Sequence, residues 1–148
     1  MIKYLNYNIV FREIPDKISL ALNITNCQNK CIGCHSSYLQ QDIGTELTNI
    51  EFNRLLDKYG DVDCILFMGE GNDKDRLIEL AKIVKNKNLL VALYSGSNFI
   101  DKDYVCIFDY IKIGEYIAEL GGLECKGTNQ KLYKVKDNNL VDITHLIS

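Results

Sequence analysis

Three cysteines lie close together in the first quarter of the chain, at Cys27, Cys31 and Cys34, in a C-x3-C-x2-C pattern. Thiolates at such spacings bind zinc or iron. No fourth cysteine follows nearby, so the motif leaves one position of a tetrahedral metal site, or one iron of a four-iron cluster, without a protein ligand. An open position indicates chemistry, whereas structural zinc sites are almost always closed by four protein ligands.

Three other interpretations of these cysteines are structural zinc binding, a dithiol redox pair and thiols without function. A structural zinc site would need a fourth ligand, but His35 directly follows Cys34 and is badly placed to share its metal, and His145 is distant in sequence. A dithiol redox pair of Cys31 and Cys34 would leave Cys27 unexplained. Loop thiols without any function are the remaining alternative. A 4Fe–4S cluster with one open iron is favoured because it uses all three thiolates.

The elements around the motif are predicted to alternate between strands and helices, which indicates α/β architecture with a parallel sheet. Helices are expected after the capping box Thr48–Glu51, after Asp73, and more weakly over residues 101–108. The hydrophobic patterns predict strands at residues 17–25, 64–68, 89–94 and 110–113, and a C-terminal hairpin formed by residues 131–135 and 140–143.

Three polar loops each follow one of the predicted parallel strands. They are the cysteine segment, the Gly69-Glu70-Gly71 break and the turn that begins at Ser95. Ligands of parallel sheets bind at the carboxyl ends of the strands, so we expect these loops to share one edge. The expected fold is a partial (β/α) barrel or open sheet of mostly parallel strands with a C-terminal hairpin, formed by one domain over residues 1–148.

Composition excludes several classes of protein. The chain has 148 residues and a net charge of -3, which argues against the basic face that nucleic-acid binding needs. No apolar stretch approaches the ~20 residues of a membrane helix, and the N-terminus does not resemble a signal peptide. We therefore expect a cytoplasmic protein with reduced thiols, in which Cys64 and Cys106 are buried in apolar runs and Cys125 has no special role.

The stretch from Cys27 to Cys34 resembles the signature of the radical S-adenosylmethionine enzymes. Within that superfamily, further stretches resemble the small activating proteins of anaerobic ribonucleoside-triphosphate reductase. The resemblance covers most of the chain and includes residues 24–27, 33–36, 67–70, 94–96, 110–114, 120–123 and 128–133.

The resemblance implies a 4Fe–4S cluster in which Cys27, Cys31 and Cys34 each bind one iron and S-adenosylmethionine binds the fourth. It implies that His35, beside the cluster in sequence, hydrogen-bonds a sulfide or the substrate, with an exposed loop histidine as the alternative. Gly33 stands where many relatives have an aromatic residue against the adenine, so that contact is expected from elsewhere.

The resemblance also implies ligand contacts after the second and third parallel strands. Gly69, Glu70 and Gly71 resemble the family's Gly-Gly-Glu stretch, which receives the ammonium group of the ligand, although the order here is Gly-Glu-Gly. Ser95 is expected to hydrogen-bond the carboxylate or ribose of the ligand, or else to cap a helix.

The activity implied is that of a glycyl-radical-generating activase. Reductive cleavage of S-adenosylmethionine would yield a 5′-deoxyadenosyl radical that takes a hydrogen atom from a glycine of anaerobic ribonucleoside-triphosphate reductase. A flavodoxin-like protein is the implied electron donor. The alternatives are another radical S-adenosylmethionine enzyme or activase, and a non-catalytic zinc-binding interaction module.

Overall fold

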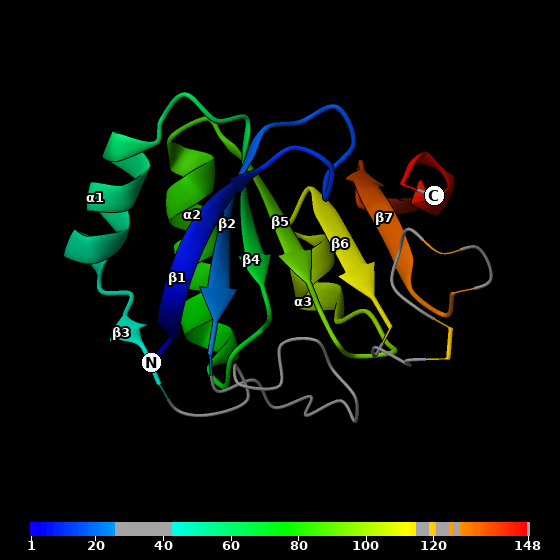
Figure 1. Ribbon diagram of the computed structural model, residues 1–148, viewed down its shortest axis with the longest axis horizontal. Helices are drawn as coiled ribbons and strands as arrows, with labels where there is room; N and C mark the ends of the chain where they lie inside the picture. Colours follow the sequence, from blue (N-terminus) through cyan, green and yellow to red (C-terminus); the bar gives the residue numbers. More distant parts are fainter. Residues whose placement is uncertain (26–42, 115–118, 121–124, 126–127, 148) are drawn as a thin grey trace.

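A mixed eight-stranded sheet runs through the molecule (Figure 1). The computed structural model describes residues 1–25, 43–114, 119–120, 125 and 128–147, so Cys27, Cys31, Cys34 and His35 lie outside the described residues. The strand order is β3-β1-β2-β4-β5-β6-β7-β8. The strands are β1 (Lys3–Val10), β2 (Ser19–Ile24), β3 (Thr45–Glu46), β4 (Cys64–Met68), β5 (Leu90–Tyr94), β6 (Tyr110–Ile113), β7 (Lys131–Lys136) and β8 (Asn139–Asp142).

The centre of the sheet is parallel and both flanks are antiparallel. Strands β2, β4, β5 and β6 pair in parallel, as the sequence predicted. On one flank β1 pairs antiparallel with β2 and β3, and on the other β7 pairs antiparallel with β6 and β8. The predicted α/β class is confirmed, while the expectation of mostly parallel strands holds only for this centre. The described strands form an open sheet that ends at β3 and β8, and they close no barrel.

Each α-helix in the described part of the chain begins after a residue whose side chain caps it. The Thr48 hydroxyl accepts a hydrogen bond from the backbone N–H of Glu51 and starts α1 (Asn49–Lys58), and Asp73 accepts one from Arg76 and starts α2 (Lys74–Asn86). Both starts were predicted from the sequence. The third helix, α3 (Lys102–Val105), is shorter than expected and is capped by Asp101.

Two layers of apolar side chains cover the sheet. Helices α1 and α2 pack on one face, where Phe67 of β4 contacts Phe52 and Phe108. The opposite face carries smaller residues of the parallel strands, such as Ala21 and Ala92, and is covered by Ile14 of the β1–β2 loop and by Ile143 near the C-terminal turn. The helices therefore lie behind the sheet in Figure 1, and the front face has a thinner cover.

The C-terminal hairpin is confirmed. Strands β7 and β8 are joined by Asp137 and Asn138, which have φ values of 52° and 62°. Two consecutive residues with positive φ form the tight turn whose twist matches that of paired strands, and Asn and Asp tolerate this conformation.

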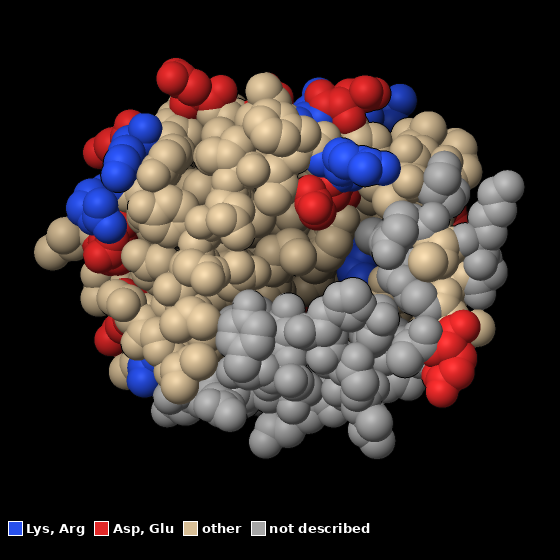
Figure 2. All heavy atoms as spheres, in the orientation of Figure 1, with Lys and Arg blue, Asp and Glu red and all other residues tan. Residues whose placement is uncertain are grey.

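The described residues include no helix that is both long enough and apolar enough to cross a bilayer. On the face of the molecule drawn in Figure 2, the acidic and basic side chains of the described residues are interspersed around a largely neutral centre.

The cysteines outside the motif differ in their surroundings. Cys64 on β4 is fully buried, as predicted. The prediction that Cys106 is buried is wrong, because its side chain is exposed at the end of α3. Its apolar neighbours Val105 and Ile107 pack against the core, so the residue between them projects outward. Cys125 is partly buried.

Burial of Cys64 predicts a loss of stability in alkali. Desolvation raises the pKa of its thiol from 9.0 to about 12. The unfolded chain therefore releases this proton at a lower pH than the folded chain, so the stabilisation is complete below about pH 9 and is lost as the pH rises toward 12. From pH 9 to pH 11 this one group should lower the free energy of unfolding by about 2 kcal/mol.

Urea unfolding of the wild type and of Cys64→Ala across this range measures the effect. Burial also raises the pKa of Tyr110, so some alkaline loss should remain in the variant. The difference between the two pH slopes isolates the thiol. Cys106→Ala, which alters an exposed cysteine, should keep the wild-type slope. Equal slopes for the wild type and Cys64→Ala would contradict the prediction.

Candidate functional site

The carboxyl ends of the four parallel strands meet at one edge of the sheet, where the predicted loops converge. At this edge β2 ends at Ile24, just before the cysteine segment, β4 ends before Gly69, and β5 ends before Ser95. The backbone N–H of Gly69 donates to the carbonyl of Tyr94 at 3.0 Å, so the turn after β4 lies against the end of β5. The structure thus brings Gly69, Glu70, Gly71 and Ser95 to the edge from which the cysteine segment departs.

The two glycines of the Gly69-Glu70-Gly71 turn have positive φ values, 120° and 69°. A Cβ atom on Gly71 would lie 2.8 Å from Cδ1 of Ile2 and 3.2 Å from Cγ2 of Ile24. Glycine is therefore needed at position 71 for backbone conformation and for packing against β2. The packing of Gly71 thus has a structural explanation that requires no ligand.

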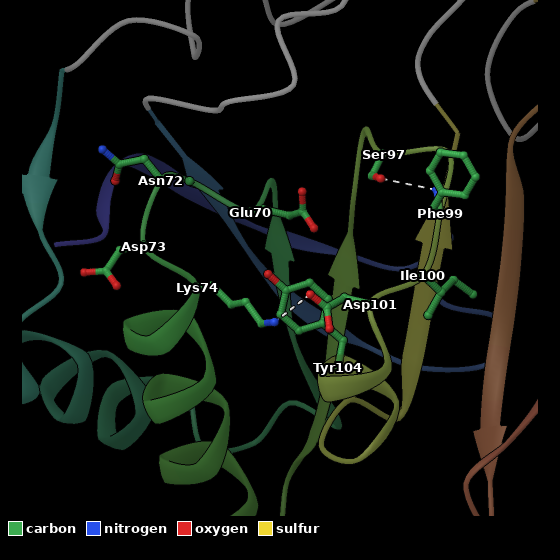
Figure 3. Close-up of a pocket in the computed structure, with 10 residues that line it drawn as sticks. Glu70, Asn72, Asp73, Lys74, Ser97, Phe99, Ile100, Asp101 and Tyr104 are labelled. Carbon is green, nitrogen blue, oxygen red and sulfur yellow. Dashed lines mark hydrogen bonds and ion pairs between the residues drawn. The ribbon is translucent and has the colours of Figure 1, made fainter.

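A cavity of about 470 Å³ opens beside this turn, on the helix side of the sheet. Figure 3 shows Glu70 directed into it, above the ring of Tyr104. Asn72 and Lys74 at the start of α2 form one wall. The loop after β5 forms the other wall, and its Phe99 is 82 % exposed.

The charges around the cavity are largely paired. The Nζ atom of Lys74 lies 2.7 Å from a carboxylate oxygen of Asp101 and 2.7 Å from one of Asp103. Hydrogen bonds to these carboxylates raise the pKa of Lys74, and the bond from Lys74 lowers that of Asp101. The pKa of Tyr104 is raised, chiefly by burial and next by the negative charge of Glu70. The cavity is lined by the Phe99 and Tyr104 rings and by the Glu70 carboxylate. These groups suit a ligand with both an apolar and a cationic part.

Ser95 is buried, and its hydroxyl is engaged in the turn after β5. The Ser95 hydroxyl accepts a hydrogen bond from the backbone N–H of Ser97 at 3.0 Å. Its own N–H donates to the carbonyl of Lys112 at 2.8 Å. The serine therefore caps a turn, while the helix that follows is capped by Asp101.

Lys112 is a site residue that sequence reasoning missed. It is 8 % exposed and lies in register with Tyr94, on the face of the sheet opposite the helices. Its ammonium group donates to the carbonyl oxygens of Ser95 and Gly114, each at 3.2 Å, and lies 5.8 Å from the centre of the Tyr94 ring. The signal in the sequence was a lysine between apolar residues of the predicted strand 110–113, because lysine is rarely buried without a partner.

Gln130 supports the same end of β6. Its side-chain amide donates to the carbonyl of Gly114 at 3.3 Å, and a Cβ atom on Gly114 would lie 2.9 Å from the Cα of Gln130. The close packing fixes the carbonyl that holds the Lys112 ammonium. This edge therefore presents a carboxylate, Glu70, on one face and an ammonium group, Lys112, on the other.

No group of three or more His, Cys, Asp or Glu side chains that could hold a metal lies within the described ranges. The three cysteines of the motif fall outside those ranges. Comparison of the chain with protein-family models, curated proteins and solved structures gave no match.

Proposed function

We propose that the protein is a radical S-adenosylmethionine activase that generates a glycyl radical on anaerobic ribonucleoside-triphosphate reductase. The observation that carries the proposal is the C-x3-C-x2-C motif directly after β2, at the edge where three further parallel strands end. When bound, a 4Fe–4S cluster and S-adenosylmethionine would supply a 5′-deoxyadenosyl radical able to take a hydrogen atom from a glycine Cα. The chain's own part is to hold both groups and to present them to the partner.

The donor set fits the proposed cluster. Cys27, Cys31 and Cys34 offer three thiolates from one short segment, the number that leaves one iron open. Cys64 is a poorer donor, because metal binding requires a thiolate and burial raises the pKa of its thiol to about 12. His35 would lie beside the cluster as a possible hydrogen-bond donor.

The edge of the sheet also suits the proposed ligand. The methionine end of S-adenosylmethionine carries an ammonium group, and the Glu70 carboxylate lines the cavity at this edge. Gly69 and Gly71 would let the backbone approach a ligand closely, and the buried Ser95 would hold the turn beside it. The partial-barrel fold of the superfamily is likewise part of the proposal, supported by the four parallel strands at the centre of the sheet.

The partner is proposed to be a large protein because the chain is small. The 148 residues of the chain amount to about one domain, which leaves little beyond the cluster and the ligand site to enclose a small substrate. An open edge can instead receive a loop of another protein. A flavodoxin-like donor would supply the electron, and the oxygen sensitivity of such clusters implies an anaerobic cytoplasm.

The test begins with the purified wild-type chain under anaerobic conditions. Reconstitution with iron and sulfide should give a brown protein with an absorbance band near ~400 nm, and a zinc module would stay colourless. Addition of reductant and S-adenosylmethionine should release 5′-deoxyadenosine. Mixing with anaerobic ribonucleotide reductase should then give a glycyl-radical doublet in electron paramagnetic resonance. If S-adenosylmethionine is cleaved but the doublet appears only on another glycyl-radical enzyme, the protein is a different activase. If no cluster forms, the proposal is contradicted.

A further inference from the structure

Strand β1 lies between the strands that lead into and out of the cysteine segment. Residues 26–42 connect the end of β2 with the start of β3, and the order of these strands is β3-β1-β2 (Figure 1). Tyr4 of β1 pairs with Ile24 on one side and with Thr45 on the other. Both ends of the cysteine segment are therefore fastened to the same short stretch of β1.

Thr25, the last residue before the segment, contacts both β1 and the first residue after the segment. Its side chain is buried, with the residue 1 % exposed, and its backbone N–H donates to the carbonyl of Lys3 at 3.0 Å. Its hydroxyl donates a short hydrogen bond to the carbonyl of Ile43, and the carbonyl of Lys3 lies 3.4 Å from the same oxygen. A threonine hydroxyl has one proton to donate, so the short bond to Ile43 is the principal one.

The chain at the return end is pressed against β1. Gly44 has a φ of 99°, and a Cβ atom there would lie 2.3 Å from the carbonyl oxygen of Tyr4. Only glycine fits at this position. The close contact between Gly44 and β1 therefore also fixes the position of the Ile43 carbonyl, to which Thr25 donates.

We propose that Thr25 is a positioning residue for the iron-binding cysteines, an inference that rests on the proposed function. Thr25 precedes Cys27 by two residues and ties the start of the segment to its end. Fixing both ends of a chain segment removes conformational freedom that metal binding would otherwise have to remove. The hydroxyl of Thr25 thus preorganises the three thiolates, although it contacts neither metal nor substrate.

The experiment compares Thr25→Val, which keeps the shape but removes the hydroxyl, with Thr25→Ser, which keeps the hydroxyl. Each reconstituted protein is mixed anaerobically with an iron chelator, and the loss of absorbance near ~400 nm is followed with time. We expect Thr25→Val to lose iron about fivefold faster than the wild type, the ratio for loss of one net hydrogen bond. Thr25→Ser should release iron at close to the wild-type rate.

The matched control is Thr144→Val, on the opposite flank of the sheet. There the hydroxyl accepts from the N–H of Leu132 and donates to Asp142, so the same chemical change removes comparable bonds. It should lower the urea midpoint of the iron-free protein about as much as Thr25→Val does, yet leave the rate of iron loss unchanged.

A second measurement tests the hydrogen bond between Thr25 and Ile43 without any metal. In the iron-free protein, amide hydrogen exchange over residues 43–47 should be faster in Thr25→Val and close to the wild type in Thr25→Ser. Iron loss at the wild-type rate from Thr25→Val, or acceleration by Thr144→Val as well, would overturn the positioning role alone. A wild-type protein that takes up no iron would overturn the proposed function and this inference together.

Discussion

Replacement of Cys31 by serine is expected to abolish iron binding, the largest functional effect that we predict for a single substitution. Serine differs from cysteine by one atom, but its hydroxyl stays protonated where a thiolate would bind iron. Two thiolates should not retain the cluster, so the absorbance near ~400 nm and the release of 5′-deoxyadenosine should both fall at least about tenfold. Iron analysis of the reconstituted, desalted protein measures the first effect.

Cys106→Ser is the matched control for this prediction. Cys106 is an exposed cysteine at the end of α3, outside the motif. Its Sγ donates a hydrogen bond to the carbonyl of Lys102, at 3.6 Å, and a serine hydroxyl can take over that contact. The variant should keep wild-type iron content. Iron retained by Cys31→Ser, or lost by Cys106→Ser, would show that the donor set is different from the proposed one.

The fold was predictable where local signals and tertiary structure agree. The Thr48 and Asp73 caps, the apolar runs of β4 and β5 and the Asp137–Asn138 turn each follow from a few neighbouring residues. Strand β1 was not predicted, because a register shift between Tyr4 and Tyr7 breaks its alternation of apolar and polar residues. Strand β3 has two residues and exists through its pairing with β1, so nothing local could predict it.

The location of the site could be predicted from the sequence, whereas several of its residues could not. Convergence of the loops followed from parallel pairing, which places the carboxyl ends of the strands at one edge. The cavity was not predictable, since its walls come from the start of α2 and from the loop after β5, which only the tertiary fold brings together. The Lys112 ammonium group is held by the carbonyl oxygens of Ser95 and Gly114, which follow β5 and β6. No spacing in the sequence predicts that arrangement.

The turn Gly69-Glu70-Gly71 illustrates how one short motif can combine packing with a proposed ligand contact. Gly71 is fully buried between Ile2 and Ile24, whereas Glu70 lines the cavity. The two residues should therefore respond differently to substitution. Glu70→Gln keeps the size of the side chain and removes its charge, so it should change the free energy of unfolding less than a substitution of the buried Gly71 does. Under the proposed function it should weaken binding of S-adenosylmethionine.

Gly71→Ala is expected to lower the free energy of unfolding by about 2–3 kcal/mol, even in protein that holds neither iron nor ligand. The positive φ of 69° costs an alanine about 1 kcal/mol or more, and its Cβ would overlap Cδ1 of Ile2 at 2.8 Å inside the core. The end of the Ile2 side chain can yield only by moving into neighbouring core residues, because Ile2 is 1 % exposed. Urea unfolding of the iron-free wild type, Gly71→Ala and Glu70→Gln measures the difference. A Gly71→Ala protein as stable as the wild type would mean that the glycine is not required for packing and that its role lies with the ligand instead.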